Sequence, residues 1–196
     1  MNHRIKTTMT DTAPTPHATA AHRVITLGGG CFWCTEAVFV RVQGVLDVES
    51  GYCNGHDPAP TYAKVCTGET GHVEVIRVTY DPQRIDLRSL LEIFFVVHDP
   101  TTLNRQGNDV GTQYRSGIYV SDAADVAVAQ EVMNEVFRHH HGQVVTELVT
   151  LDNYHAAEDY HQDYFANHPD QGYCAFVVAP KVQKFLKTFA DRVAHG

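Results

Sequence analysis

Residues 23–42 read RVITLGGGCFWCTEAVFVRV, and this stretch builds the fold around a cysteine. Its pattern predicts a strand over 23–27, a glycine turn over 28–30 and a helix over 31–42. Cys31 would then stand at a helix N-terminus, where partial positive charge and free N–H groups lower the pKa of a thiol. A small buried thiol behind a tight turn is the alternative. The chain's only tryptophan, Trp33, lies beside it and favours a nucleophile.

The rest of the chain mixes strands and helices without a regular alternation. The apolar spacing predicts strands over 45–52, 73–80, 117–120 and 144–151, and helices over 87–98, 123–140, 158–167 and 182–193. A long loop rich in Asn, Gly and Thr follows the first of these helices and ends near Arg115. We expect an α+β fold, a single-domain α/β sandwich with a mixed, mainly antiparallel sheet covered by helices.

Length and composition restrict the classes of protein that the chain can belong to. The 196 residues suit one domain, which we assign to 23–196, after a disordered N-terminal tail over 1–22 that lacks the apolar core of a signal peptide. The net charge of -8 disfavours nucleic acid and anionic membranes as partners, and no apolar run is long enough to span a bilayer. Five irregularly spaced cysteines are typical of the reducing cytoplasm. We expect a cytoplasmic monomer.

Gly30-Cys31-Phe32-Trp33 resembles the signature of the peptide methionine sulfoxide reductases of the A type. Further blocks resemble that family in its order, from about residue 23 to 189: Gly51-Tyr52, Pro60-Thr61-Tyr62, Thr70-Gly71-His72-Val73-Glu74, His98-Asp99-Pro100, residues 105–116, residues 157–162 and Gly172-Tyr173-Cys174. The resemblance implies reduction of the S epimer of methionine sulfoxide, free or in proteins, as a repair of oxidative damage. It also implies thioredoxin as the external reductant, with no bound cofactor and no metal.

The resemblance implies a role for several side chains. Glu74 matches the acid that protonates the sulfoxide oxygen, and a carboxyl group in an apolar pocket has the raised pKa that this task needs. Tyr62 and Tyr114 match positions that hydrogen-bond the same oxygen as neutral donors. The substrate-binding positions are Phe32 and Trp33, an apolar wall for the methyl group, and Asp109.

After oxygen transfer, Cys31 should carry a sulfenic acid that a second thiol converts to a disulfide. Cys174 matches a resolving position of the family, in a C-terminal segment that we expect to be flexible, and we prefer it. Cys34 stays open as the alternative, because it stands where the commoner family form has glycine and makes a CxxC spacing with Cys31. A relay that uses Cys31, Cys34 and Cys174 in sequence stays open as well. For Cys53 and Cys66 we expect small buried side chains.

Two other functions compete with this interpretation. A general thiol-disulfide oxidoreductase would use Cys31 and Cys34, but the order of elements differs from thioredoxin and leaves Glu74 unexplained. A zinc or interaction module would need a second ligand pair of comparable spacing. The histidines at 139–141, and His155, Glu158 and His161 at helical spacing, offer no convincing partner cluster, so we interpret them as a solvated helix end and as core packing.

Overall fold

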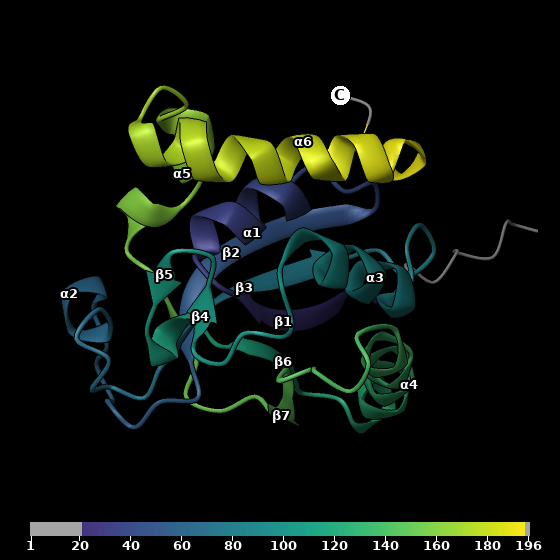
Figure 1. The fold of residues 1–196 in the computed structure, drawn as a ribbon, viewed down its shortest axis with the longest axis horizontal. Coiled ribbons are helices and arrows are strands. Elements are labelled where there is room, and N and C mark those ends of the chain that lie inside the picture. Colours follow the sequence, from purple (N-terminus) through teal and green to yellow (C-terminus); the bar gives the residue numbers. More distant parts are fainter. Residues whose placement is uncertain (1–20, 195–196) are drawn as a thin grey trace, which may run out of the picture.

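The computed structural model describes residues 21–194, in which a six-stranded sheet is covered by helices (Figure 1). The sheet order is β7-β6-β1-β3-β2-β8, and every pair is antiparallel except β6 with β7. The strands are β1 (Arg23–Gly29), β2 (Val45–Cys53), β3 (Val73–Tyr80), β6 (Ser116–Val120), β7 (Glu147–Thr150) and β8 (His155–Ala156), and a separate pair joins β4 (Arg105–Gln106) to β5 (Asp109–Val110). The predicted mixed, mainly antiparallel sheet is confirmed.

Four longer helices pack beside this sheet. They are α1 (Phe32–Phe39), α3 (Leu87–Val97), α4 (Ala123–His139) and α6 (Ala179–Thr188), and the short helices are α2 (Tyr62–Val65) and α5 (Tyr164–Asn167). α6 lies across α1 on the outside of the molecule (Figure 1). Side chains of α1, α3 and α6 bury one core with the inner face of the sheet, including Leu27, Phe39, Phe94 and Phe185. This packing holds α1, and with it the nucleophile candidate, on a rigid layer.

Local signals explain where the helices begin. Asp86 precedes α3 and accepts a hydrogen bond from Ser89 N at 2.8 Å, and Asp122 precedes α4 and accepts one from Ala124 N at 2.9 Å. Such caps satisfy N–H groups that have no partner within the helix. None of the helices within residues 21–194 is long and apolar enough to cross a membrane.

Three predicted elements are wrong in detail. Gly28 and Gly29 continue β1, and a Cβ at Gly29 would lie 3.0 Å from the side chains of both Phe94 and Thr35, so these neighbours would have to move for a larger residue; Gly30, with φ of 91°, makes the turn alone. The helix predicted over 158–167 is broken into the 3₁₀ turn Asp159–His161 and α5. The last helix begins before Pro180, since the π-helical turn Cys174–Val178 runs into α6 and a proline is tolerated in a first turn. The tail predicted over 1–22 falls almost wholly outside the described residues.

Candidate active site

Cys31 is the N-cap residue of α1, directly after the Gly30 turn, and its side chain is only 7% exposed. Gly30 is required there, because a Cβ on it would overlap the Gln106 side chain at 2.6 Å. Gln106 in turn bonds both the N–H and the carbonyl of Asp99 at 3.0 Å. The loop after α3 is thereby fixed against the backbone that presents the thiol.

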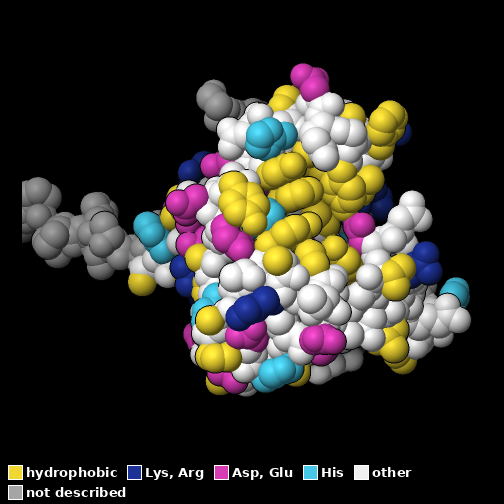
Figure 2. Space-filling model, turned by 90° about the vertical axis from the view of Figure 1, so that its left-hand side faces the viewer, with side chains coloured by type: hydrophobic (Ala, Val, Ile, Leu, Met, Phe, Trp, Pro, Cys, Tyr) yellow, Lys and Arg dark blue, Asp and Glu magenta, His cyan; other side chains and the backbone are white. Residues whose placement is uncertain are grey.

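A cavity of about 260 Å³ opens at this thiol and collects most of the predicted site residues. Its lining consists of Cys31, Phe32, Trp33, Tyr62, Glu74, Asp109, Tyr114, Gln171 and Tyr173. Five separate regions of the chain supply these residues, namely α1, α2, β3, the loop that contains β5, and the segment before Cys174. Figure 2 shows hydrophobic side chains gathered in a hollow on the side of the molecule where α2, β5 and α5 lie. Candidate residues that are far apart in the sequence thus meet at one cavity.

Glu74 lies at the bottom of this site, on β3, and is 1% exposed. Its Oε2 accepts a hydrogen bond from Phe32 N at 3.1 Å, at the first turn of α1. Burial raises the pKa of its carboxyl group to about 8, against the weaker opposing effect of that hydrogen bond. Glu74 therefore holds a proton near neutral pH and can donate it.

Tyr62 and Tyr114 face the same cavity from two different loops. Tyr62 opens α2 and its backbone N–H donates to Glu158 Oε1 at 2.8 Å, while Glu158 Oε2 accepts from Tyr52 Oη at 2.8 Å. Tyr114 ends a 3₁₀ turn that follows β5. Burial raises the pKa of both phenols. Both therefore stay neutral and keep the hydroxyl proton that a hydrogen bond to an oxygen needs.

The Trp33 indole is held from two sides by the segment after β8. Its ring stacks on Tyr164 with centroids 3.7 Å apart and planes inclined by 4°, and its Nε1 donates to His161 Nδ1 at 3.1 Å. His161 is 1% exposed, so its predicted packing role is confirmed, but it also orients the tryptophan. His155, Glu158 and His161 do not share a helix, and residues 21–194 contain no His, Cys, Asp or Glu group suited to a metal ion.

The thiols correct two expectations. Cys31 and Cys34 lie in one turn, in which Cys34 N donates to Cys31 O at 3.1 Å. Burial and the interaction with Cys34 raise the pKa of Cys31, whereas the interaction with Cys31 lowers the pKa of Cys34 to about 7. The helix N-terminus therefore does not offset the cost of burying the Cys31 charge. Cys174 is fully buried in the π-helical turn, not in a free segment. Burial, followed by the charge of Cys34, raises the pKa of Cys174.

Two lining residues were missed by sequence reasoning, Tyr173 and Gln171. Tyr173 Oη donates to Asp109 Oδ2 at 2.5 Å and lies 3.9 Å from Cys34 Sγ. The Gly172-Tyr173-Cys174 block contains this tyrosine, but the resemblance assigned a role only to its cysteine. Cys53 is buried as expected, whereas Cys66 is exposed, so its predicted burial is wrong.

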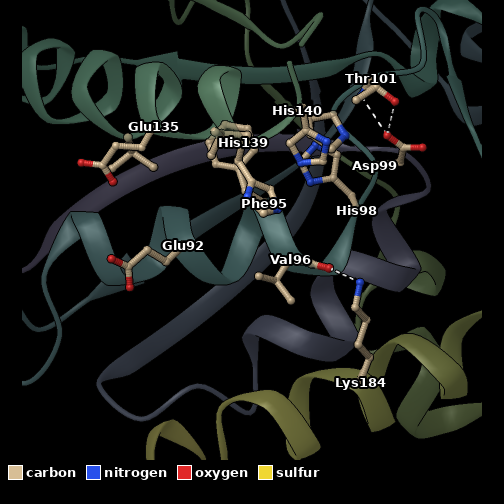
Figure 3. A pocket seen from close by; sticks show the side chains of 13 residues that line it. Glu92, Phe95, Val96, His98, Asp99, Thr101, Glu135, His139, His140 and Lys184 are labelled. Atoms are coloured by element: carbon tan, nitrogen blue, oxygen red, sulfur yellow. Dashed lines mark hydrogen bonds between the residues drawn. The ribbon is translucent and has the colours of Figure 1, made fainter. Parts of the chain in front are cut away.

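A larger cavity of about 670 Å³ lies between α3 and α4 (Figure 3). Phe95, Val132 and Val136 form apolar parts of its wall, and Lys184 reaches its edge with Nζ 2.6 Å from Val96 O. Its lining contains no cysteine and none of the predicted site residues. The size of a cavity therefore does not identify the active site in this protein, because Cys31 and Glu74 both line the smaller cavity.

The model of one protein family, described as peptide methionine sulfoxide reductase, matches residues 23–193. The chain belongs to this family. Peptide methionine sulfoxide reductase MsrA of Saccharolobus solfataricus is 54% identical over 170 residues, which cover 87% of this chain and 96% of the relative. The MsrA of Polynucleobacter asymbioticus is 53% identical over 171 residues, covering 86% and 90%. As a family member, the chain is an oxidoreductase, a peptide-methionine (S)-S-oxide reductase.

Solved methionine sulfoxide reductases share the fold. Mxr1 from Saccharomyces cerevisiae in reduced form matches with a TM-score of 0.73 and 37% identity, over 78% of this chain and 89% of that one. Methionine sulfoxide reductase A of Corynebacterium diphtheriae gives 0.73 and 35%, over 84% and 86%. Mxr1 in complex with Trx2 gives 0.52 and 27%, over 78% and 90%. The fold and the recognition from sequence blocks are confirmed, and the general CxxC oxidoreductase is not favoured.

Proposed function

We propose that this methionine sulfoxide reductase acts on the S epimer of methionine sulfoxide, free or within proteins, with Cys31 as its nucleophile. The observation that carries the proposal is the meeting of the Cys31 thiol, the protonated Glu74 and two neutral tyrosines around one cavity of about 260 Å³. A thiol beside a buried acid and neutral hydroxyl donors suits the transfer of oxygen from a sulfoxide.

In the proposed reaction, the Cys31 sulfur attacks the sulfoxide sulfur while Glu74 protonates the sulfoxide oxygen. Tyr62 and Tyr114 hydrogen-bond that oxygen as its negative charge develops. The oxygen passes to Cys31 as a sulfenic acid, the sulfur–oxygen bond of the substrate breaks, and methionine leaves. The proton given up by the thiol returns to Glu74, so the thiol is oxidised, the sulfoxide is reduced and no external acid is consumed.

Phe32 and Trp33 are proposed to form the wall for the substrate's methyl group, and Asp109 to bind a polar part of the substrate. The wall is supported by the burial of Phe32, at 1% exposed, and by the fixed orientation of the indole. Asp109 lines the cavity and already accepts a hydrogen bond from Tyr173. A carboxylate at the cavity edge can accept a further N–H or N⁺–H donor from a methionine residue or free methionine.

For the second half-reaction, we propose that Cys34 attacks the sulfenic acid first, and that Cys174 then exchanges with the resulting disulfide as the final resolving thiol. The position of Cys34 in the same helical turn as Cys31, with Cys34 N donating to Cys31 O at 3.1 Å, supports the first step. The pKa of about 7 for Cys34 also supports it, since a thiolate is the attacking species. Cys174 responds to the charge of Cys34, which supports their proximity. Water leaves when the first disulfide forms.

We propose thioredoxin as the external dithiol and the cytoplasm as the place of action, with residues 23–196 as the working domain of a monomer. The complex of the related Mxr1 with Trx2 supports the reductant. All five cysteines are free, which suits a reducing compartment.

The test is an assay with each epimer of methionine sulfoxide, in the presence and absence of thioredoxin and its reductase. Turnover of the S epimer that depends on thioredoxin, with no turnover of the R epimer, is the expected result. Reduction of a plain disulfide at a comparable rate, without sulfoxide turnover, would contradict the proposal. When Cys31 is replaced by serine, Cys53→Ser is the matched control and should keep its activity, because Cys53 is a buried thiol that does not line the cavity.

A further inference from the structure

Glu36 is a buried carboxyl group to which the proposed reaction gives no part. It lies on α1, three residues after Trp33, and is 2% exposed. Burial raises the pKa of its carboxyl group to about 7. A buried acid is costly unless hydrogen bonds compensate for lost hydration, so its partners indicate its use.

Two of its three partners are backbone N–H groups of one corner in the C-terminal half. Oε1 accepts from Asp163 N at 3.0 Å and Oε2 from Tyr164 N at 3.3 Å, while Ser50 Oγ donates to Oε1 at 3.2 Å. Asp163 precedes α5 and its own side chain makes no capping bond. The carboxyl group of Glu36 therefore caps α5 from another helix.

This corner is conformationally unfavourable without support. Asp163 has φ of 52° and ψ of 31°, in the left-handed region that residues other than glycine adopt at a cost. The corner separates the turn that carries His161 from α5, which begins at Tyr164. Both of these side chains hold the Trp33 indole.

We propose that Glu36 is a positioning residue, which fixes the Asp163–Tyr164 corner and so holds Tyr164 and His161 against Trp33. Trp33 and Glu36 are three positions apart on one helix and face the same segment, one through its ring and the other through its carboxyl group. The consequence for substrate rests on the proposed role of Trp33 as the methyl wall. The expected change in the orientation and shielding of the Trp33 indole does not rest on that proposed role.

The experiment compares Glu36→Gln with wild type by sulfoxide kinetics and by tryptophan fluorescence. Glutamine keeps the shape of glutamate but has only one acceptor oxygen for the N–H groups of Asp163 and Tyr164. Its NH₂ group would therefore face one of these two donors. We expect KM for the S epimer to rise about tenfold, equivalent to about 1.4 kcal/mol, with the single-turnover rate at saturating sulfoxide nearly unchanged. Acrylamide should quench the fluorescence more efficiently, and Trp33, as the only tryptophan, reports alone.

Two further variants separate positioning from stability. Tyr164→Leu removes the ring that Glu36 is proposed to hold, so adding Glu36→Gln to it should raise KM less than Glu36→Gln does in wild type. Asp163→Gly adopts the left-handed corner without strain, so adding it to Glu36→Gln should bring the raised KM part of the way down and restore part of the shielding of Trp33. If Glu36→Gln alone fails to fold, the same comparison is made in the Asp163→Gly background. Glu69→Gln, at an exposed glutamate, is the control.

Unchanged KM and unchanged quenching in folded Glu36→Gln would overturn the proposal, as would fully additive effects with Tyr164→Leu. A merely structural role would lower the melting temperature without moving either readout in the folded protein. If the chain reduced no sulfoxide at all, the proposed function would fail while the quenching measurement still tested Glu36. The two failures are therefore distinguishable.

Discussion

At the scale of single residues, charge states govern this active site. Burial favours the protonated form of Glu74 and of Cys31, whereas the pKa of Cys34 is lowered to about 7 by its interaction with Cys31. The Cys31 thiol and the Glu74 acid are therefore uncharged at rest, and the reactive thiolate forms as the proton is transferred. This arrangement suits an uncharged substrate, because a sulfoxide gains little from a permanent charge but much from a proton at its oxygen.

Replacing Cys31 by serine should abolish sulfoxide reduction, because a hydroxyl group is a far weaker nucleophile than a thiolate near neutral pH. The fold should persist, since the side chain changes by one buried atom. Single-turnover methionine release, measured by chromatography together with circular dichroism, checks both statements. Release of a full equivalent of methionine from the variant would exclude Cys31 as the oxygen acceptor.

Replacing Glu74 by glutamine should lower the single-turnover rate by about a hundredfold or more and leave KM within a few fold, because general acid catalysis contributes mainly in the transition state. In the wild type the acid form of Glu74 is lost as pH rises through about 8, so the rate should fall above that pH. The fall should be absent in Glu74→Gln. A variant with a normal rate and an unchanged alkaline limb would move the acid to Tyr62 or Tyr114.

At the scale of elements, two rigid pieces bring the thiols together. The first turn of α1 presents Cys31 and Cys34, and the turn Cys174–Val178 buries Cys174 between α1 and the outer layer. Neither element is a loop that can swing freely. The proposed disulfide exchange with Cys174 would therefore require local opening of the segment around Tyr173, whose hydroxyl group donates a hydrogen bond to Asp109.

Mass spectrometry of trapped enzyme after one turnover tests the order of the thiols. Cys174→Ser should accumulate a Cys31–Cys34 disulfide and be reduced slowly by thioredoxin, while Cys34→Ser should accumulate the Cys31 sulfenic acid, because its nearest attacking thiolate is gone. Both variants should release one equivalent of methionine. A Cys31–Cys174 disulfide forming at the wild-type rate in Cys34→Ser would instead assign direct resolution to Cys174.

At the scale of the whole molecule, burying Glu74 in the active site lowers the free energy of unfolding at neutral pH. Glu74 is protonated in the folded protein up to about pH 8, whereas an exposed glutamate ionises near pH 4.3. Between these values the folded state binds one proton more than the unfolded state at this residue. The contribution of Glu74 to the free energy of unfolding therefore falls as pH rises across that window.

The difference in unfolding free energy between Glu74→Gln and wild type should consequently shift in favour of the variant as pH rises from about 5 to about 8. The slope should reach up to ~1.4 kcal/mol per pH unit, the value for one proton. Urea titrations at several pH values across the window measure it. A difference that stayed constant with pH would mean that Glu74 ionises normally in the folded protein.

The amino-acid sequence by itself determined the fold class, the family and most of the residues that line the site. The strand over 73–80 matches β3 residue for residue, because its β-branched residues end at Asp81-Pro82 and so leave a local pattern, and Cys31 begins its helix as predicted. Ordered blocks such as Gly30-Cys31-Phe32-Trp33 identified most of the lining residues, although they gave no distances between them. How those residues act together stays a prediction at this level.

Only the tertiary structure decided the charge states, the break in the helix predicted over 158–167, and the support behind Trp33. The pKa of Cys31 depends on burial by the whole core, and the left-handed corner at Asp163 depends on Glu36, which is 127 positions away in the chain. Local periodicity carries no information about such contacts. Free energies of desolvation and of hydrogen bonding belong to the assembled fold, which is why they outweighed the helix N-terminus at Cys31 and the helical spacing around His161.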